Sequence, residues 1–166
     1  MFKILGFYKF INITKLKKHK QELQLFMAKN EVRGVLILAK EGINGAISGK
    51  KNTIAFIEKK ILKQFNFKYF DSRNNSSSKF QPFHKAKVKI KKEVVPFGLS
   101  LNKKSKKKNI YVAPDKWNEL INKKTTLLID ARKPFEHKVG TFRGASNPNV
   151  NNFRDFPKYL NKVKKS

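Results

Sequence analysis

The chain has 166 residues and no cysteine, and its 39 Lys and Arg residues against 11 Asp and Glu give a formal net charge of +28. This length allows one domain or two small ones with a buried core, and the missing cysteines exclude disulfides and thiolate metal sites within it. So strong a charge favours polyanionic partners such as nucleic acid, although an AT-biased genome that over-uses Lys, Asn, Ile and Phe is the alternative source of the charge.

The first half of the chain alternates between strand and helix patterns. Apolar residues on both sides of segment 3–10 predict a strand that is buried on both faces. Thr14 is a suitable N-cap for the helix that follows. Residues 35–39 are typical of a central strand, and the glycines within 42–45 predict a turn into a further strand at 46–48.

A second helix and a further strand complete this half. An apolar stripe at helical spacing predicts the helix, and its members are Ile54, Ile57, Ile61 and Phe65. Residues 67–70 return as extended chain. The order strand, helix, strand, strand, helix, strand is the ferredoxin-like βαββαβ arrangement, in which two helices cover one face of an antiparallel sheet. We therefore expect a ferredoxin-like domain, an α+β fold, in residues 1–95.

Two polar segments follow, and their predicted roles differ. Residues 74–78, Asn-Asn-Ser-Ser-Ser, are rich in turn formers and predict a surface loop. Beyond them apolar and basic residues alternate strictly, which predicts a strand with one buried face and one lysine face. The buried face consists of Ala86, Val88 and Ile90, and the lysine face consists of Lys85, Lys87, Lys89 and Lys91.

The remaining sequence predicts a linker and a second region of α/β type. Residues 96–109 lose all periodicity and collect five lysines, which is typical of a solvated basic linker. In residues 110–166, Pro114 suits the first turn of a helix that carries Trp117, and Leu-Leu-Ile at 127–129 predicts a strand inside a parallel sheet. A complete open α/β domain usually needs more than about 100 residues, so we expect this sheet to lack strands.

The segment 41–49, Glu-Gly-Ile-Asn-Gly-Ala-Ile-Ser-Gly, places three glycines around a tight reversal. Glu41 and Asn44 form a candidate ligand site there, since they would present a carboxylate and an amide across the turn. A hairpin turn with a purely structural role is the alternative. The spacing of the two residues does not separate these interpretations.

The candidate RNA-binding residues are the alternating lysines Lys85, Lys87, Lys89 and Lys91. Lysines that contact RNA phosphates release the counterions bound to the RNA, and this release favours binding. A solvated face without a ligand is the alternative. Nearby aromatic residues are either base-stacking groups or core, namely Phe80, Phe83 and His84. The three histidines of the chain have no partner at metal-ligand spacing, so the sequence predicts no metal site.

Four segments in one order carry a family resemblance, and they are Phe-Tyr-Lys-Phe at 7–10, the run 39–49, the run 87–98 and Asp-Ala-Arg at 130–132. Such an ordered set is hard to obtain by chance. From about Leu5 onward the chain resembles the bacterial tRNA uridine(34) hydroxylase family. The resemblance implies an acylphosphatase-like form of the ferredoxin-like fold, followed by a rhodanese-like domain.

The same resemblance implies a reaction and its partners. The family performs an oxygen-dependent hydroxylation of the wobble uridine of tRNA to 5-hydroxyuridine, so it implies tRNA as partner and molecular oxygen as co-substrate, with no other cofactor evident. Asp130, Arg132 and Glu136 match the early rhodanese motif, which frames the sheet without supplying the nucleophile, and we expect a structural role for them. The family's active-site cysteine has no counterpart here, so no catalytic residue is assigned.

We therefore expect a shortened, catalytically incomplete member of this family, in which an incomplete rhodanese-like region follows the first domain. One alternative is a non-enzymatic RNA-binding module. Another is half of a split gene, with a separate chain supplying the rest of the rhodanese domain. No apolar run approaches the roughly 20 residues that span a bilayer, so we expect a cytoplasmic location and no membrane partner. The sequence leaves the oligomeric state open.

Overall fold

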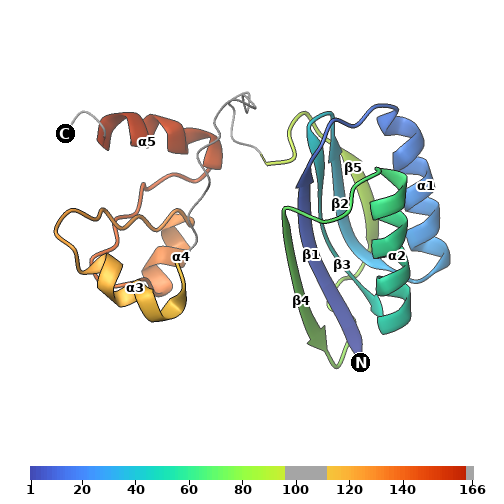
Figure 1. Cartoon of the computed structure of the whole chain (residues 1–166), viewed down its shortest axis with the longest axis horizontal. Coiled ribbons are helices and arrows are strands. Elements are labelled where there is room, and N and C mark those ends of the chain that lie inside the picture. Colours follow the sequence, from blue (N-terminus) through green and yellow to red (C-terminus); the bar gives the residue numbers. More distant parts are fainter. Residues whose placement is uncertain (96–111, 164–166) are drawn as a thin grey trace. The chain divides into compact units, whose positions relative to one another are not determined.

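The computed structural model describes residues 1–95 and 112–163 (Figure 1). The chain divides into two compact units, unit 1 from Met1 to Val95 and unit 2 from Pro96 to Ser166. The basic linker expected at 96–109 lies outside the described residues.

Unit 1 is built on one five-stranded sheet. Its elements in chain order are β1 (Phe2–Phe10), α1 (Leu16–Lys29), β2 (Arg33–Ala39), β3 (Gly42–Lys50), α2 (Lys51–Gln64), β4 (Ser72–Ser78) and β5 (Ala86–Ile90). The strand order is β4-β1-β3-β2-β5, and all neighbours pair antiparallel except β2 and β5. The first four strands confirm the expected ferredoxin-like domain, and β5 adds a parallel edge strand beside β2.

Both helices of unit 1 lie on the same face of the sheet (Figure 1). The core lies between the two helices and the sheet. Alternate strand residues point to this face, and the helices present apolar stripes to it. Fully buried members include Leu5, Leu23, Met27, Leu36, Leu38, Ile43, Ile47, Ile57 and Ile61. We call the other side of the sheet, which carries neither α1 nor α2, the open face.

The prediction of a loop at 74–78 is wrong, since these residues form most of β4. Strand β4 pairs with β1 along its length, with Ser76 opposite Ile4 and Asn74 opposite Gly6. An edge strand is held by backbone pairing and leaves its side chains in solvent, so polar residues suit it. The prediction of a strand at 67–70 is also wrong. That segment bends, and Phe70 instead fills the core beside Phe7, with ring centroids 4.4 Å apart.

Three predicted details at the start of the fold need correction. Strand β1 buries Leu5 and Phe7 on one face only, because no helix of unit 1 covers its other face. Thr14 is not the N-cap of α1. The chain places Ile13 in the core and caps the helix at Lys15, which adopts a left-handed conformation with φ 51°. The turn after β2 falls at 40–41, so the glycines of 42–45 already belong to β3.

Unit 2 is mainly helical. It contains α3 (Pro114–Ile121), α4 (Pro134–Val139), the short 3-10 helix η1 (Phe153–Asp155) and α5 (Phe156–Val163). The helix predicted from Pro114 is confirmed. The strand predicted at 127–129 is reduced to one parallel bridge between Ile129 and Ser146, because the described residues contain no further strand for it to pair with. Over the described ranges of both units, no helix is long and apolar enough to span a bilayer.

Candidate functional site

The lysines of β5 stand on the open face of the sheet. In the parallel register Lys87 lies opposite Val35 and Lys89 opposite Ile37, and partners in a register point to the same side. The intervening Val88 points to the helix side and is 4% exposed. Consecutive lysines therefore stand about 6 to 7 Å apart along the strand. We call Lys85, Lys87, Lys89 and Lys91, all exposed, the lysine row.

A basic hollow lies at one end of this row. It has a volume of about 560 Å³ and is lined by Leu16, Lys40, Ile90, Lys91 and Lys92. Lys40 comes from the turn between β2 and β3, and Lys91 and Lys92 follow β5, so two chain segments bring three cations together. Such a hollow favours anionic groups.

The two residues of the candidate turn site have different surroundings. Glu41 lies in the turn, and its Oε1 accepts a hydrogen bond from the backbone N–H of Val94 at 2.8 Å. This bond ties the segment after β5 to the turn. Asn44 is the third residue of β3 and lies on the open face, opposite Tyr8 of β1 and Ile37 of β2. The structure therefore does not join the two side chains in one turn site.

Two aromatic residues of the open face were not predicted as functional from the sequence. Tyr8 and Phe10 share that face of β1, and their rings meet edge to face with centroids 5.6 Å apart. The alternation along β1 carried the signal, because Leu5 and Phe7 occupy the core side and leave Tyr8 on the other. Of the aromatics that precede β5, Phe80 is 71% exposed and Phe83 is half-buried.

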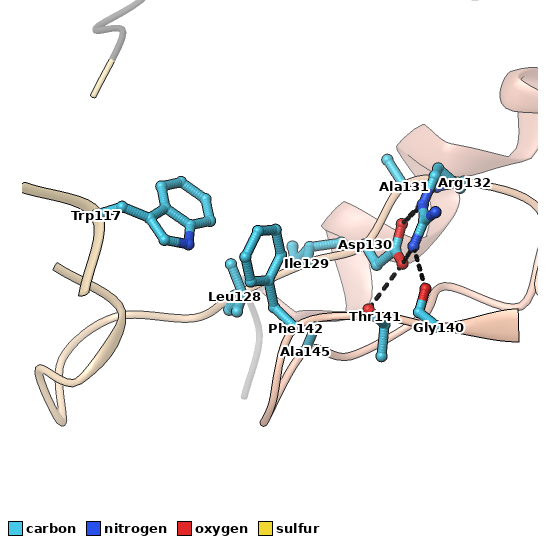
Figure 2. Close-up of a pocket in the computed structure, with 10 residues that line it drawn as sticks. All are labelled: Trp117, Leu128, Ile129, Asp130, Ala131, Arg132, Gly140, Thr141, Phe142 and Ala145. Carbon is cyan, nitrogen blue, oxygen red and sulfur yellow. Dashed lines mark hydrogen bonds and ion pairs between the residues drawn. The ribbon is translucent and has the colours of Figure 1, made fainter. Parts of the chain in front are cut away.

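Unit 2 contains a pocket of about 500 Å³ around the rhodanese-like motif (Figure 2). Its lining residues are Trp117, Leu128, Ile129, Asp130, Ala131, Arg132, Gly140, Thr141, Phe142 and Ala145. Figure 2 shows apolar side chains at one end and a polar cluster at the other. The rings of Trp117 and Phe142 approach to 5.2 Å between centroids at the apolar end.

Asp130 is the centre of the polar cluster. It accepts two hydrogen bonds from the Arg132 guanidinium, at 2.9 and 2.7 Å, and one from the Thr141 hydroxyl at 2.8 Å. These bonds, the Arg132 pair first, hold the pKa of the Asp130 carboxyl well below its usual range. Arg132 also donates to the Gly140 carbonyl at 2.6 Å, so the cluster ties the motif to the segment after α4.

Glu136 is not part of this cluster. Its Oε2 accepts a hydrogen bond from the backbone N–H of Lys133 at 3.1 Å, so the side chain caps the first turn of α4. The structure thus brings Asp130 and Arg132 together and places Glu136 at a helix start. The two carboxylates and the guanidinium are all occupied by hydrogen bonds within the chain.

The apolar end of the pocket has an unsatisfied polar group. The indole N–H of Trp117 is buried and, among the described residues, has no hydrogen-bond acceptor. Leu127, Phe135 and Phe142 are each more than half exposed. Within 112–163, no hydrophobic side chain is as buried as those of the unit 1 core. Unit 2 is therefore weakly packed over the part that the structure describes.

Comparisons with known proteins bear on both units. A family model described as the UPF0176 acylphosphatase like domain matches residues 2–94. A tRNA uridine(34) hydroxylase of Pelagibacter ubique is 60% identical over 166 residues, which is 100% of this chain and 55% of that protein. A tRNA uridine(34) hydroxylase of Bartonella bacilliformis is 36% identical over 96% of this chain and 52% of its own length.

The chain thus spans about half the length of the curated relatives that it matches. Among solved structures, the acylphosphatase from Bacillus subtilis is matched over 55% of this chain and 98% of its own, with 11% identity and a TM-score of 0.38.

Proposed function

This chain belongs to the tRNA uridine(34) hydroxylase family, and we propose that it serves as the tRNA-contacting part of an enzyme that converts the wobble uridine to 5-hydroxyuridine. Molecular oxygen is the proposed co-substrate, as the family resemblance implies. Because tRNA is the proposed substrate, we also propose a cytoplasmic location.

The lysine row is the observation that carries this proposal. Its register with β2 holds Lys87 and Lys89 on one exposed face, at a spacing suited to successive phosphates of a nucleic-acid backbone. The hollow lined by Lys40, Lys91 and Lys92 places two further lysines at the end of the row. We propose that phosphate contacts here position the tRNA, while the sequence-specific contacts lie elsewhere.

We propose that the reactive thiol comes from outside these 166 residues, which contain no cysteine. It is supplied by further residues of the same protein or by a separate chain. We propose structural roles in the rhodanese-like region for Asp130, Arg132 and Glu136. Arg132 bonds to Asp130 and to a backbone carbonyl, and Glu136 bonds to a backbone N–H.

The missing cysteine favours a second candidate function, a non-enzymatic RNA-binding module. Both functions use the lysine row, and they differ only in whether a thiol is supplied from elsewhere. Restoration of 5-hydroxyuridine by this chain together with a cysteine-containing rhodanese half would select the first function. Binding of tRNA without such restoration would select the second.

The lysine row is tested by replacing Lys85, Lys87, Lys89 and Lys91 with Gln. A matched control replaces four exposed helix lysines on the other side of the sheet, Lys17, Lys20, Lys59 and Lys63, with Gln. Binding to a tRNA transcript is measured by fluorescence anisotropy over a salt series. We expect the first variant to weaken binding and flatten the log-log salt slope by up to about 3, at roughly 0.7 to 0.9 per phosphate.

The control removes the same charge and is expected to keep most of the slope. Equal losses in both variants would mean that binding follows net charge alone. Unchanged binding by the lysine-row variant would show that the row is only a solvated surface.

A further inference from the structure

The open face of unit 1 combines aromatic, amide and cationic side chains in one row across the sheet. Tyr8 of β1 lies opposite Asn44 of β3, Asn44 lies opposite Ile37 of β2, and Ile37 lies opposite Lys89 of β5. Partners in each register point to the same side, so all four side chains share the open face. Three strand spacings separate Tyr8 from Lys89, which is about 14 Å.

The neighbouring rungs extend this surface without adding negative charge. A second row of open-face residues lies two positions nearer the start of β1. It consists, across the sheet, of Gly6, Ala46, Val35 and Lys87. Phe10, 39% exposed, extends the aromatic end beside Tyr8. Every residue of the five strands is described, and none on the open face is acidic.

Two carboxylates lie near the aromatic end, Asp71 and Glu41, and both are bonded within the chain. Asp71 accepts a hydrogen bond from the backbone N–H of Phe10 at 2.8 Å and pairs with the Lys9 ammonium at 2.7 Å. The surface is therefore complementary to a polyanion at its lysine end and offers flat aromatic groups at the other. A duplex would use only the lysines, because its bases are stacked on each other and cannot reach an aromatic ring.

We propose that the open face of unit 1 binds an unpaired RNA segment, whose phosphates contact Lys87 and Lys89 and whose bases stack on Tyr8 and Phe10. Small side chains between the two ends, Gly6 and Ala46, let the backbone of the RNA approach the sheet. The side-chain amide of Asn44 lies between the aromatic end and the lysine end, where it donates to or accepts from the edge of a base. This inference rests on the proposed tRNA-binding function and narrows its substrate to single-stranded segments.

The test compares an unpaired RNA dodecamer with a perfect RNA duplex of the same length, using the full chain. In the platform variant Tyr8→Leu and Phe10→Leu, the apolar volume remains while the aromatic rings are lost. We expect at least tenfold weaker binding of the single strand, since stacking contributes about 1 to 3 kcal/mol per base. Binding of the duplex and the salt slope are expected to stay unchanged.

The matched control replaces two exposed aromatics outside the rungs of the open face, Phe56→Leu and Tyr69→Leu, which are 59% and 72% exposed. This control is expected to bind both RNAs as the original chain does. Equal losses in the two double variants, or an unchanged single-strand affinity in the platform variant, would overturn the inference.

A second measurement does not depend on how the variants fold. A 2-aminopurine base in the dodecamer reports stacking through its fluorescence, and we expect its emission to change when the dodecamer binds to the original chain. An unchanged emission on binding to the original chain would also overturn the inference. If the original chain binds neither RNA, the proposed function itself fails. If it binds both equally and only the lysine-row variant weakens binding, the function stands and the aromatic platform fails.

Discussion

Gln24 of α1 accepts a hydrogen bond from the backbone N–H of Val88 in β5, at 2.8 Å between its Oε1 and the nitrogen. The same side-chain amide donates from Nε2 to the Ala86 carbonyl at 3.0 Å. One side chain thus satisfies two backbone groups on the outer edge of β5, which has no further strand beside it in the sheet. An edge strand closed in this way is less open to pairing with another chain.

The first prediction concerns this cap. Gln24→Leu keeps the volume and removes both hydrogen bonds, so we expect the free energy of unfolding to fall by about 1 to 3 kcal/mol. Urea unfolding followed by far-UV circular dichroism measures the change. Gln21→Leu, on the exposed side of the same helix, is the control and should change stability by less than about 0.5 kcal/mol. Equal effects of the two substitutions would contradict a specific capping role.

The second prediction concerns Gly34 at the start of β2. Its φ is +123°, and a Cβ there would lie 2.7 Å from Ile47 Cα and closer still to the Ala46 carbonyl oxygen. Because backbone on the neighbouring strand cannot yield cheaply, we expect Gly34→Ala to destabilise unit 1 by at least about 2 kcal/mol. Thermal unfolding measures it.

Gly6 is the matched control, since it lies in β1 with no heavy atom within 4 Å of an added Cβ. Gly6→Ala should leave the melting temperature unchanged or raise it slightly, because alanine reduces the entropy of the unfolded chain. A melting temperature for Gly34→Ala as high as that for Gly6→Ala would rule out the steric argument.

The third prediction is a pH dependence in unit 2. Hydrogen bonds from Arg132 and Thr141 lower the pKa of Asp130 in the folded chain. A lowered folded-state pKa contributes stability above the unfolded value near 3.9, and that stability is lost as the pH falls through and below this value. We expect the fluorescence of Trp117, the one tryptophan of the chain, to report loss of structure below about pH 4.

Asp130→Asn should lower the stability of unit 2 at neutral pH and remove most of this acid dependence. Asp155→Asn, which removes a surface ion pair with Lys158 at 3.6 Å, should preserve the acid dependence. An acid transition that is identical in the chain and in Asp130→Asn would assign the titration to another group.

The fourth prediction is that unit 2 unfolds before unit 1. Its described residues contribute nothing to the buried core, whereas unit 1 buries large side chains from both helices and four strands. In a urea titration, the Trp117 signal should change at a lower concentration than the last phase of the far-UV signal, which reports the two 14-residue helices and the sheet of unit 1. Coincident transitions would show that the two units unfold together.

The fifth prediction concerns activity. Expressed alone in a strain without its own tRNA uridine(34) hydroxylase, residues 1–166 should yield no 5-hydroxyuridine, because they contain no thiol. Mass analysis of total tRNA measures the product. The Pelagibacter ubique relative, 60% identical over the shared region, serves as the positive control. Product formed by the chain alone would require a route that does not use cysteine.

Local patterns in the sequence predicted the elements whose side chains alternate between core and solvent. Val88 between lysines predicted β5, and the spacing of Ile54, Ile57 and Ile61 predicted α2. The same reasoning failed at β4, where Asn and Ser predicted a loop. An edge strand is decided by backbone pairing with its neighbour, and no side-chain period records that pairing.

Local sequence patterns thus predict the ferredoxin-like order of unit 1 and the lysine row, and the sequence contains no thiol. Which residues stand beside that row is set by the tertiary structure. Tyr8, Asn44 and Lys89 are far apart in the chain, and the strand registers alone bring them onto one face. It likewise reduced the predicted strand at 127–129 to one bridge at Ile129, because a parallel strand forms only where neighbouring strands accept its backbone hydrogen bonds.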